Sequence, residues 1–382
     1  MLTKNIKFKN FNLNHTNKKL KKIFSKILNK DDEILKSLTP NYKNQYSKSL
    51  IQKFKKKKVL KIIGMGGSIL GTQAIHDYLR HKIKKETFFF DNIETNLKIK
   101  KRATNLIISK SGTTLETIVN SNILIKKNDK NIFITESRES YLRLLALKIK
   151  AEIIDHNNFI GGRYSVLSEV GMLPAELMGL NADKFKQLNN LIKNKNFVNS
   201  LISNVSSTLL FIKNKKFNSI ILNYDSSANN LFLWYQQLIA ESLGKKGKGI
   251  LPIISLMPKD NHSLMQLYLD GPKNNFFTFF YTKAKSHLKM NHNKILKSHN
   301  YLRNKTVDEI KFSQKIATEN VFLKKKIPFR SFEIIHRDEK SLGEIFCFFI
   351  LETILLGKAL KVNPYDQPSV ELIKKETTKI LI

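Results

Sequence analysis

The sequence predicts an α/β protein with two similar halves, each built on a mainly parallel sheet flanked by helices. Three observations carry this prediction. Short apolar runs alternate with helical patterns from residue 59 onward, the alternation begins again near residue 217, and a polar stretch at about 185–200 separates the two series. Strands that alternate with helices at this spacing form parallel sheets with helical crossovers.

Length and composition indicate a folded protein of more than one domain. The chain has 382 residues, of which 41% are apolar, enough for two or more substantial cores. A single cysteine, Cys347, excludes an internal disulfide and fits a reducing compartment. The N-terminus lacks the apolar run of a signal peptide, and the longest apolar run, 345–356, is too short to span a bilayer. We therefore expect a cytoplasmic protein that does not enter a membrane.

The net charge of +36 raises the question of a nucleic-acid partner. The lysines are spread over the whole chain, and clusters such as 55–58 and 324–326 are short and lack interleaved arginine and aromatic residues. Lys, Asn and Ile are all abundant and have AT-rich codons, so genome composition accounts for the charge better than nucleic-acid binding. We expect no nucleic-acid partner, and we expect the positive field to attract small anionic substrates.

The first half of the chain divides into a helical segment and a first α/β domain. Residues 1–55 are polar with spaced apolar positions, which predicts an N-terminal helical segment. The first domain is expected over 56–190. Its predicted strands are 59–63, 87–90, 105–109, 131–135 and 151–155, and its predicted helices run from the glycine loop to about residue 80 and over about 114–126.

The second half repeats the pattern. A second α/β domain is expected over 200–362, with strands at 217–224, 249–255 and 274–282 and helices at 231–244 and about 341–360. The turn NPYDQP then leads into a terminal helix from Val370, so that 363–382 forms a C-terminal helical segment.

The stretch IIGMGGSILG at 62–71 places four glycines after the first predicted strand. Gly64 and Gly66 fit a dinucleotide-binding fingerprint, but Ile69 stands where the third glycine belongs, and the GK[ST] of a nucleoside-triphosphate loop is absent. What remains is a strand, a glycine turn, Ser68 and a helix, which suits an anion or sugar hydroxyls. The alternative, equally supported by the residues alone, is a tight turn with Ser68 as the N-cap.

The segment SKSGTTLET at 109–117 again follows a predicted strand directly. Serine and threonine hydroxyls with free N–H groups at a helix start form a phosphate cradle. The alternative is a capping box between Thr113 and Glu116. Because the number of donors exceeds what a cap requires, phosphate binding is the favoured interpretation.

The helix in QQLIAESLGKKGKG brings Gln237 and Glu241, four residues apart, onto one otherwise apolar face. A carboxylate in that setting can act as a general base near neutral pH. The alternative is a solvent-facing glutamate near a helix C-terminus, the more common fate of this residue type.

Three single residues stand near these motifs. His262 lies at a loop-to-helix transition and can transfer protons near neutral pH, although one histidine among nine is weak evidence. Arg163 follows two glycines that could direct its guanidinium into a cleft. Lys374 opens the last helix. No histidine or cysteine spacing suggests a metal, and no GxSxG motif suggests a serine hydrolase.

With these motifs in view, the sequence resembles the glucose-6-phosphate isomerase family from about residue 59 to the C-terminus. IGMGGSILG, ISKSGTTLET, NNFIGGRYSV, QQLIAESLGKKGKG, NHSLMQLYLDGP and GKALKVNPYDQPSVELIK are similar to six family segments and occur in the family's order. The resemblance implies two sugar-isomerase (SIS) type α/β domains and reversible aldose–ketose isomerisation of glucose 6-phosphate through an enediolate. It requires no cofactor and no metal.

The resemblance also implies a role for each site residue. Glu241 would be the base that moves a proton between C1 and C2, and Arg163 would stabilise the enediolate. His262 and Lys374 would assist ring opening, and the resemblance does not decide which of the two opens the ring. His262 would reach the site of a neighbouring subunit in a homodimer. The residues expected to bind the phosphate are Ser109, Lys110, Ser111 and Thr114, and those expected to line the sugar are Gly67, Ser68, Gln237 and Glu116. We also expect Gly67→Val to weaken substrate binding without unfolding the chain.

Two departures from the family pattern lie beside Lys374. Ser369 stands where the family prefers glycine or alanine, and Ile373 stands where glycine often precedes the lysine. Both residues belong to the segment that directs Lys374. Two other classes of function compete with an isomerase: a non-catalytic sugar-phosphate sensor on the same fold, which needs no base, and a basic nucleic-acid-binding protein.

Overall fold

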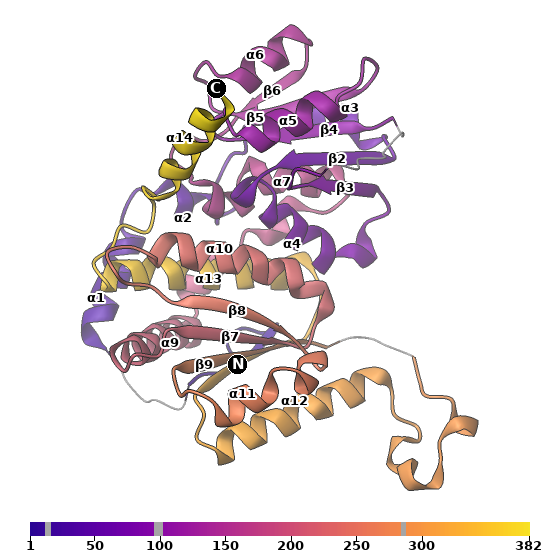
Figure 1. The fold of residues 1–382 in the computed structure, drawn as a ribbon, viewed down its shortest axis with the longest axis vertical. Helices are drawn as coiled ribbons and strands as arrows, with labels where there is room; N and C mark the ends of the chain where they lie inside the picture. The colour runs from indigo at the N-terminus through magenta and orange to yellow at the C-terminus, as the bar shows by residue number, and fades with distance from the viewer. Residues whose placement is uncertain (12–16, 95–101, 284–287) are drawn as a thin grey trace.

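Two five-stranded sheets stacked one above the other form the framework of the molecule (Figure 1). The computed structural model describes residues 1–11, 17–94, 102–283 and 288–382. The predicted α/β class with two mainly parallel sheets is confirmed.

The first sheet has the order β3-β2-β4-β5-β6, and all its strands are parallel. Its strands are β2 Val59–Gly64, β3 Glu86–Phe90, β4 Thr104–Ile108, β5 Lys130–Thr135 and β6 Glu152–Asp155, close to the predicted ranges. The helices between and after them are α4 Leu70–Tyr78, α5 Leu115–Leu124, α6 Tyr141–Lys148 and α7 Glu169–Leu177. Gly64 pairs with Ile108, so the loops that follow β2 and β4 leave the same edge of the sheet side by side.

The second sheet has the order β1-β10-β9-β7-β8 and is parallel except for β1, which runs antiparallel to β10. Its strands are β1 Ile6–Lys9, β7 Asn218–Asn223, β8 Leu251–Leu256, β9 Asn275–Thr282 and β10 Phe329–Ile334. Its helices include α10 Asn229–Leu243, α11 Met265–Asp270, α12 Val307–Lys324 and α13 Glu339–Ala359. The predictions found β7, β8, β9, α10 and α13 but not β1, β10 or α12.

The N-terminal segment contains helices, as predicted, but it also supplies the edge strand β1 to the second sheet. Its helices are α1 Lys18–Leu28, α2 Glu33–Ser37 and α3 Lys48–Lys55. The helices α8 Leu188–Lys193 and α9 Lys195–Lys213 fill the predicted inter-domain stretch, and α14 Val370–Leu381 ends the chain. The first and last parts of the chain therefore belong to different layers, and the predicted domain limits stay a prediction.

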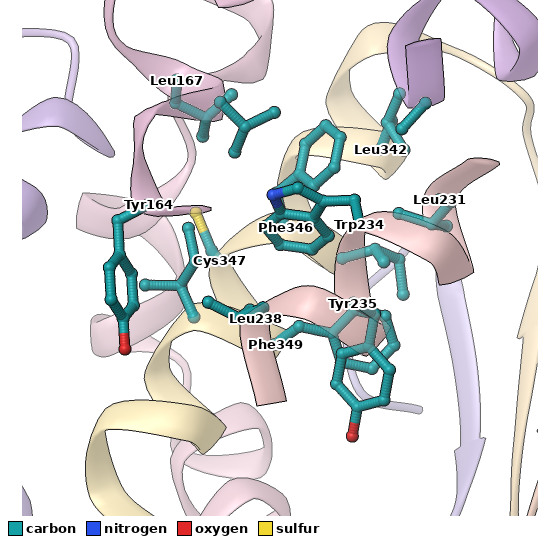
Figure 2. Packing of buried hydrophobic residues seen from close by; sticks show 14 of the residues in the cluster. Tyr164, Leu167, Leu231, Trp234, Tyr235, Leu238, Leu342, Phe346, Cys347 and Phe349 are labelled. Carbon is teal, nitrogen blue, oxygen red and sulfur yellow. The ribbon is translucent and has the colours of Figure 1, made fainter. Parts of the chain in front are cut away.

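The main core lies between the two sheets, where α10 and α13 run (Figure 1). Trp234 of α10 packs edge-on against Phe346 of α13 with ring centroids 4.8 Å apart, and Tyr164 and Leu167 approach from the first domain (Figure 2). Each large apolar side chain buried in this way stabilises the fold by roughly 1.5–3 kcal/mol. The core thus fixes α10, which carries the predicted base, against both domains.

One buried polar network lies behind α10. Arg330 of β10 forms an ion pair with Glu352 of α13, and both side chains are buried. Asn204 and the hydroxyl of Tyr235 also donate to Glu352, at 2.5 and 3.1 Å. Because these donors satisfy the carboxylate, Glu352 can be buried in the apolar run at 345–356, which forms the middle of α13. No helix among the described residues is long and apolar enough to cross a membrane.

Candidate active site

The glycine loop after β2 packs directly on the backbone around Arg163. A Cβ added at Gly67 would lie 2.2 Å from the carbonyl carbon of Gly162 and 2.4 Å from the amide nitrogen of Arg163. At Gly66, which has φ +53°, an added Cβ would lie 2.9 Å from Nε2 of Gln237. The glycines are therefore required where three segments meet, and a valine at Gly67 would displace the backbone of Gly162 and Arg163, so its effect would not be limited to substrate binding. That Gly67→Val leaves the chain folded stays a prediction.

The N-cap alternative for Ser68 is also wrong. Residues Gly66–Ser68 form a short 3-10 helix, and Ile69, not Ser68, is the N-cap of α4. The Ser68 hydroxyl therefore does not cap α4, and it lies next to the place where the three segments contact one another.

Arg163 lies at the centre of the candidate site and is 3% exposed. It is the second residue of the 3-10 helix Gly162–Leu167 and directly follows Gly161 and Gly162. Its Nε donates to Oγ of Ser242 at 2.8 Å, its Nη1 donates to Oε1 of Gln367 at 2.9 Å, and its Nη2 donates to the carbonyl oxygens of Pro364 and Asp366 at 2.7 and 3.1 Å. A guanidinium held through three nitrogens has one fixed orientation.

The carboxylate of Glu241 lies against this guanidinium. Its Oε1 is 3.2 Å from Nη1 of Arg163, and its Oε2 accepts a hydrogen bond of 2.9 Å from Nε2 of Gln237. As their spacing predicted, Gln237 and Glu241 lie one turn apart on α10 and contact each other. The Glu241 side chain is 22% exposed, so a small molecule can reach a carboxylate whose position is fixed from two sides.

The segment after β4 leads into the N-terminus of α5, on the strand next to the glycine loop. The hydroxyls of Ser109 and Thr114 lie 3.0 Å apart, and the amide of Gly112 donates to Oγ of Ser109 at 3.2 Å. The capping-box alternative is wrong: the N-cap of α5 is Thr114, and its side chain makes no capping hydrogen bond. Thr113 donates instead to Oγ of Ser111 at 3.1 Å. The N–H groups of the first turn of α5 are therefore open to an anion.

Lys110 points away from the hydroxyls of this loop toward residues that follow β5 and β6. Its ammonium donates to the carbonyl of Asn158 at 2.7 Å and lies 3.5 Å from Glu136. Arg138 binds the same carboxylate at 2.9 Å. A role of Lys110 at the phosphate requires its side chain to leave these partners.

Helix α14 lies beside the first domain (Figure 1) and encloses a cavity of about 630 Å³ with α5. The polar residues that line this cavity are Ser111, Thr113, Thr114, Glu116, Arg138, Glu371, Lys374, Thr377 and Thr378. Lys374 pairs with Glu371 at 2.7 Å. The structure thus brings Lys374 to the predicted phosphate loop, and Glu116, which was expected to line the sugar, lines this cavity as well. Of the two positions that depart from the family pattern, Ile373 lines the same cavity and Ser369 is the N-cap of α14.

His262 is not part of this assembly. It ends the short 3-10 helix Lys259–His262 after β8, and its side chain is exposed. Within the described part of the chain it has no side-chain hydrogen bond. Its neighbour Asp260 shapes the turn by accepting from the hydroxyls of Ser255 and Ser263.

Three residues of the site were missed by sequence reasoning. Ser242, Tyr164 and Gln367 surround Arg163, and the Tyr164 hydroxyl also lies 2.9 Å from Oγ of Ser242. Each stands inside a motif that was singled out, and Ser242 and Tyr164 directly follow the named residues Glu241 and Arg163, so motif membership was the available signal. No group of three or more histidine, cysteine, aspartate or glutamate side chains in the described ranges is placed to hold a metal ion.

Comparison with known proteins gives concordant matches. Residues 45–382 match the family model of phosphoglucose isomerase. Glucose-6-phosphate isomerase of Methanocaldococcus jannaschii is 33% identical over 345 residues, 82% of this chain and 82% of that protein. The enzyme of the same name from Mycoplasmopsis pulmonis is 33% identical over 361 residues, 86% of this chain and 84% of that protein.

Two solved structures have the same fold. A hypothetical protein from Thermus thermophilus superposes with a TM-score of 0.83 at 22% identity, covering 95% of this chain and 94% of the other. A glucose-6-phosphate isomerase from Chlamydia trachomatis gives a TM-score of 0.72 at 18% identity, with 96% of this chain and 75% of the other covered.

Proposed function

The chain belongs to the phosphoglucose isomerase family, and on that premise we propose that it interconverts glucose 6-phosphate and fructose 6-phosphate. Such an enzyme serves glycolysis and gluconeogenesis. Its two α/β units are the sugar-isomerase (SIS) type domains expected from the resemblance. The observation that carries the proposal at the level of residues is the contact between Glu241 and Arg163, a carboxylate and a fixed cation at a site that a small molecule can reach.

This pair supplies what the reaction needs. The open-chain aldose loses the proton on C2 to the Glu241 carboxylate, which leaves an enediolate with negative charge on oxygen. A proton moves from O2 to O1 of the enediolate, and the protonated Glu241 then gives its proton to C1, which leaves the carbonyl on C2 and the hydroxyl on C1 of the ketose. Arg163 stabilises the charge that develops between the two steps, and its buried, preformed hydrogen bonds mean that little reorganisation accompanies the reaction.

The phosphate of the substrate belongs at the start of α5. Gly64 and Ile108 are paired neighbours, so the loops after β2 and β4 lie next to each other, and a sugar phosphate can extend from one to the other. We assign the phosphate to Ser109, Ser111, Thr114 and the helix N-terminus, with Lys374 as a nearby cation. The sugar then lies toward Gly67, Ser68, Gln237 and Glu241. Because the phosphate is remote from C1 and C2, its binding energy serves to orient them.

We assign ring opening to His262 and Lys374, with His262 acting in the site of the neighbouring subunit of a homodimer in the cytoplasm. The support within the chain is that His262 is exposed and lies apart from Glu241 in sequence and element, after β8 rather than on α10. A second copy is then needed to complete each site.

A coupled assay on fructose 6-phosphate tests the isomerase directly. Turnover by the purified protein is expected. A protein that binds sugar phosphate but gives no turnover is instead the sensor.

Subunit mixing tests the shared site. Glu241→Gln and His262→Gln should each be nearly inactive alone. In a mixed dimer one of the two sites keeps both Glu241 and His262, so unfolding and refolding the two variants together should restore activity. If the mixture stays as inactive as the separate variants, His262 acts within its own subunit and the shared site is refuted.

A further inference from the structure

The segment 360–367 supplies much of what orients Arg163. Two of the acceptors of its guanidinium are the main-chain carbonyls of Pro364 and Asp366, and a third is the side chain of Gln367. The orientation of the guanidinium toward Glu241 is therefore only as well fixed as this segment is.

Two lysines from the turn after α10 hold the segment in place. Lys245 donates to the carbonyl of Asn363 and forms an ion pair of 2.8 Å with Asp366. Lys248 donates to the carbonyl of Leu360 at 2.8 Å. The Lys245 side chain is 12% exposed, far less than the 53% of Asp366, and its hydrogen bond to Asp366 is the largest cause that lowers the pKa of that carboxyl.

The turn itself is built to present these two side chains together. Lys245 and Lys248 form an isolated antiparallel bridge, and between them Lys246 and Gly247 have φ values of +53° and +68°. Lys246 occupies the same turn but is exposed, and none of its side-chain atoms has a partner among the described residues. The turn therefore distinguishes two anchoring lysines from one that is free.

We propose that Lys245 is a positioning residue of the active site: by fixing the 360–367 segment it sets the orientation of Arg163 toward Glu241. This rests on the proposed function, and it assigns a role to lysines of the GKKGKG motif that the chemistry of proton transfer leaves unexplained. Helix α10 carries Glu241 and Ser242, which contact Arg163 directly, and the turn that follows α10 holds the segment 360–367, whose oxygen atoms also accept from Arg163. The helix therefore positions the arginine directly, and its turn does so through the segment.

The consequence is a loss of turnover with little loss of binding. Lys245 is connected to Arg163 only through the 360–367 segment: it donates to the carbonyl of Asn363 and pairs with Asp366, whose carbonyl accepts from Nη2 of Arg163. Small displacements of groups that act in the transition state reduce kcat strongly, whereas the hydroxyls assigned to the phosphate, those of Ser109, Ser111 and Thr114, lie on a loop of the first domain that Lys245 does not hold. Removing the ammonium should therefore reduce kcat and leave KM almost unchanged.

The experiment compares Lys245→Gln with the matched control Lys246→Gln, which removes the same charge from the same turn. We expect kcat on fructose 6-phosphate to fall about 10-fold in Lys245→Gln with KM within about two-fold of wild type, and both constants to stay at wild-type values in Lys246→Gln. Lys245→Arg keeps a positive donor and should retain most of the activity. Combining Lys245→Gln with Asp366→Asn should cost less than the product of the two separate losses, because both remove the same ion pair.

Hydrogen exchange of the backbone amides in 360–367 gives a readout that does not depend on activity. Exchange there should become faster in Lys245→Gln and stay unchanged in Lys246→Gln. Unchanged exchange and turnover in Lys245→Gln, equal losses in both variants, or a fall in kcat that accompanies a general loss of thermal stability would each overturn the proposal. If wild type shows no isomerase activity, the proposed function fails, while the exchange comparison still decides whether Lys245 holds the segment.

Discussion

At the scale of single residues, the structure explains why the loop after β2 is rich in glycine, which the sequence could only partly suggest. Close glycines predicted close approach, and the partner that the structure shows is another loop of the same protein, at Gly162 and Arg163. A glycine motif indicates that some group lies close to the backbone, but it does not identify that group. The same limit explains why Ser242 and Gln367 were missed, since their importance comes from contacts with Arg163 across the fold.

Gly67→Ala should destabilise the protein. The added methyl would lie 2.2 Å from the carbonyl carbon of Gly162, and overpacking of this kind costs about 1–3 kcal/mol. Chemical denaturation measures the loss. Gly161→Ala is the matched control, because a Cβ there meets only Tyr164, at 3.8 Å, and should leave the free energy of unfolding unchanged. Equal stability of the two variants would refute the packing role of Gly67.

Glu241→Gln should remove the base while keeping its shape. The amide can still contact Arg163 and Gln237 but cannot take a proton from carbon. We expect kcat to fall by at least about 100-fold with little change in KM. Steady-state kinetics in the coupled assay give both constants, and near-normal turnover would exclude Glu241 as the base.

At the scale of elements, the strands and helices with strong apolar patterns were predicted closely, and those with mixed patterns were not. Strand β10, FRSFEI, contains Arg330 and Glu333, whose partners Glu352 and Lys7 lie far along the chain. Strand β1 has four residues, two of them lysines. Arg330 can be buried in β10 because Glu352 on α13 pairs with it, and the local pattern of β10 does not show that partner. The caps of α4 and α5 were wrong by one residue for a related reason, since tertiary packing decides where each helix begins.

Helix α14 places Lys374, but not the adjacent Lys375, at the cavity beside the loop that we propose binds phosphate. Lys374 lines the cavity with Ser111 and Thr114, whereas Lys375 does not. A charged hydrogen bond is worth about 1.5–3 kcal/mol, so Lys374→Gln should lower kcat/KM roughly 10-fold or more. Lys375→Gln removes the same charge and should have no effect. If both variants lose activity equally, general electrostatic attraction and not a site contact explains the lysine.

At the scale of the whole molecule, the two sheets pack on either side of α10 and α13. The candidate site forms where loops of the first domain meet α10 and the segment 360–367. Family-level order of motifs predicted which segments converge, but only the fold shows that the segment 360–367 reaches back to Arg163. The dispersed positive charge, +36 in total, gives no comparable structural clue.

Acid should destabilise the fold through His156. This residue is 2% exposed, and burial lowers its pKa to about 4. Between about pH 6.5 and pH 4 the His156 imidazole is protonated in the unfolded chain but stays neutral in the folded protein. The free energy of unfolding therefore decreases as the pH falls through that window, by about 3 kcal/mol. Denaturation at pH 7 and pH 4.5 measures the change. His156→Asn should show a smaller loss than wild type, and an equal loss would assign the acid sensitivity to other groups.

The central claim is that Glu241 transfers a proton between C2 and C1 of an open-chain sugar phosphate held against Arg163. Isomerisation of glucose 6-phosphate in D2O tests it most directly, because a carboxyl that carries the proton can exchange it with solvent before returning it. Wild type should place deuterium at C1 of fructose 6-phosphate, and Glu241→Gln should lose isomerisation and deuterium incorporation together. Incorporation by Glu241→Gln at the wild-type rate would contradict the account.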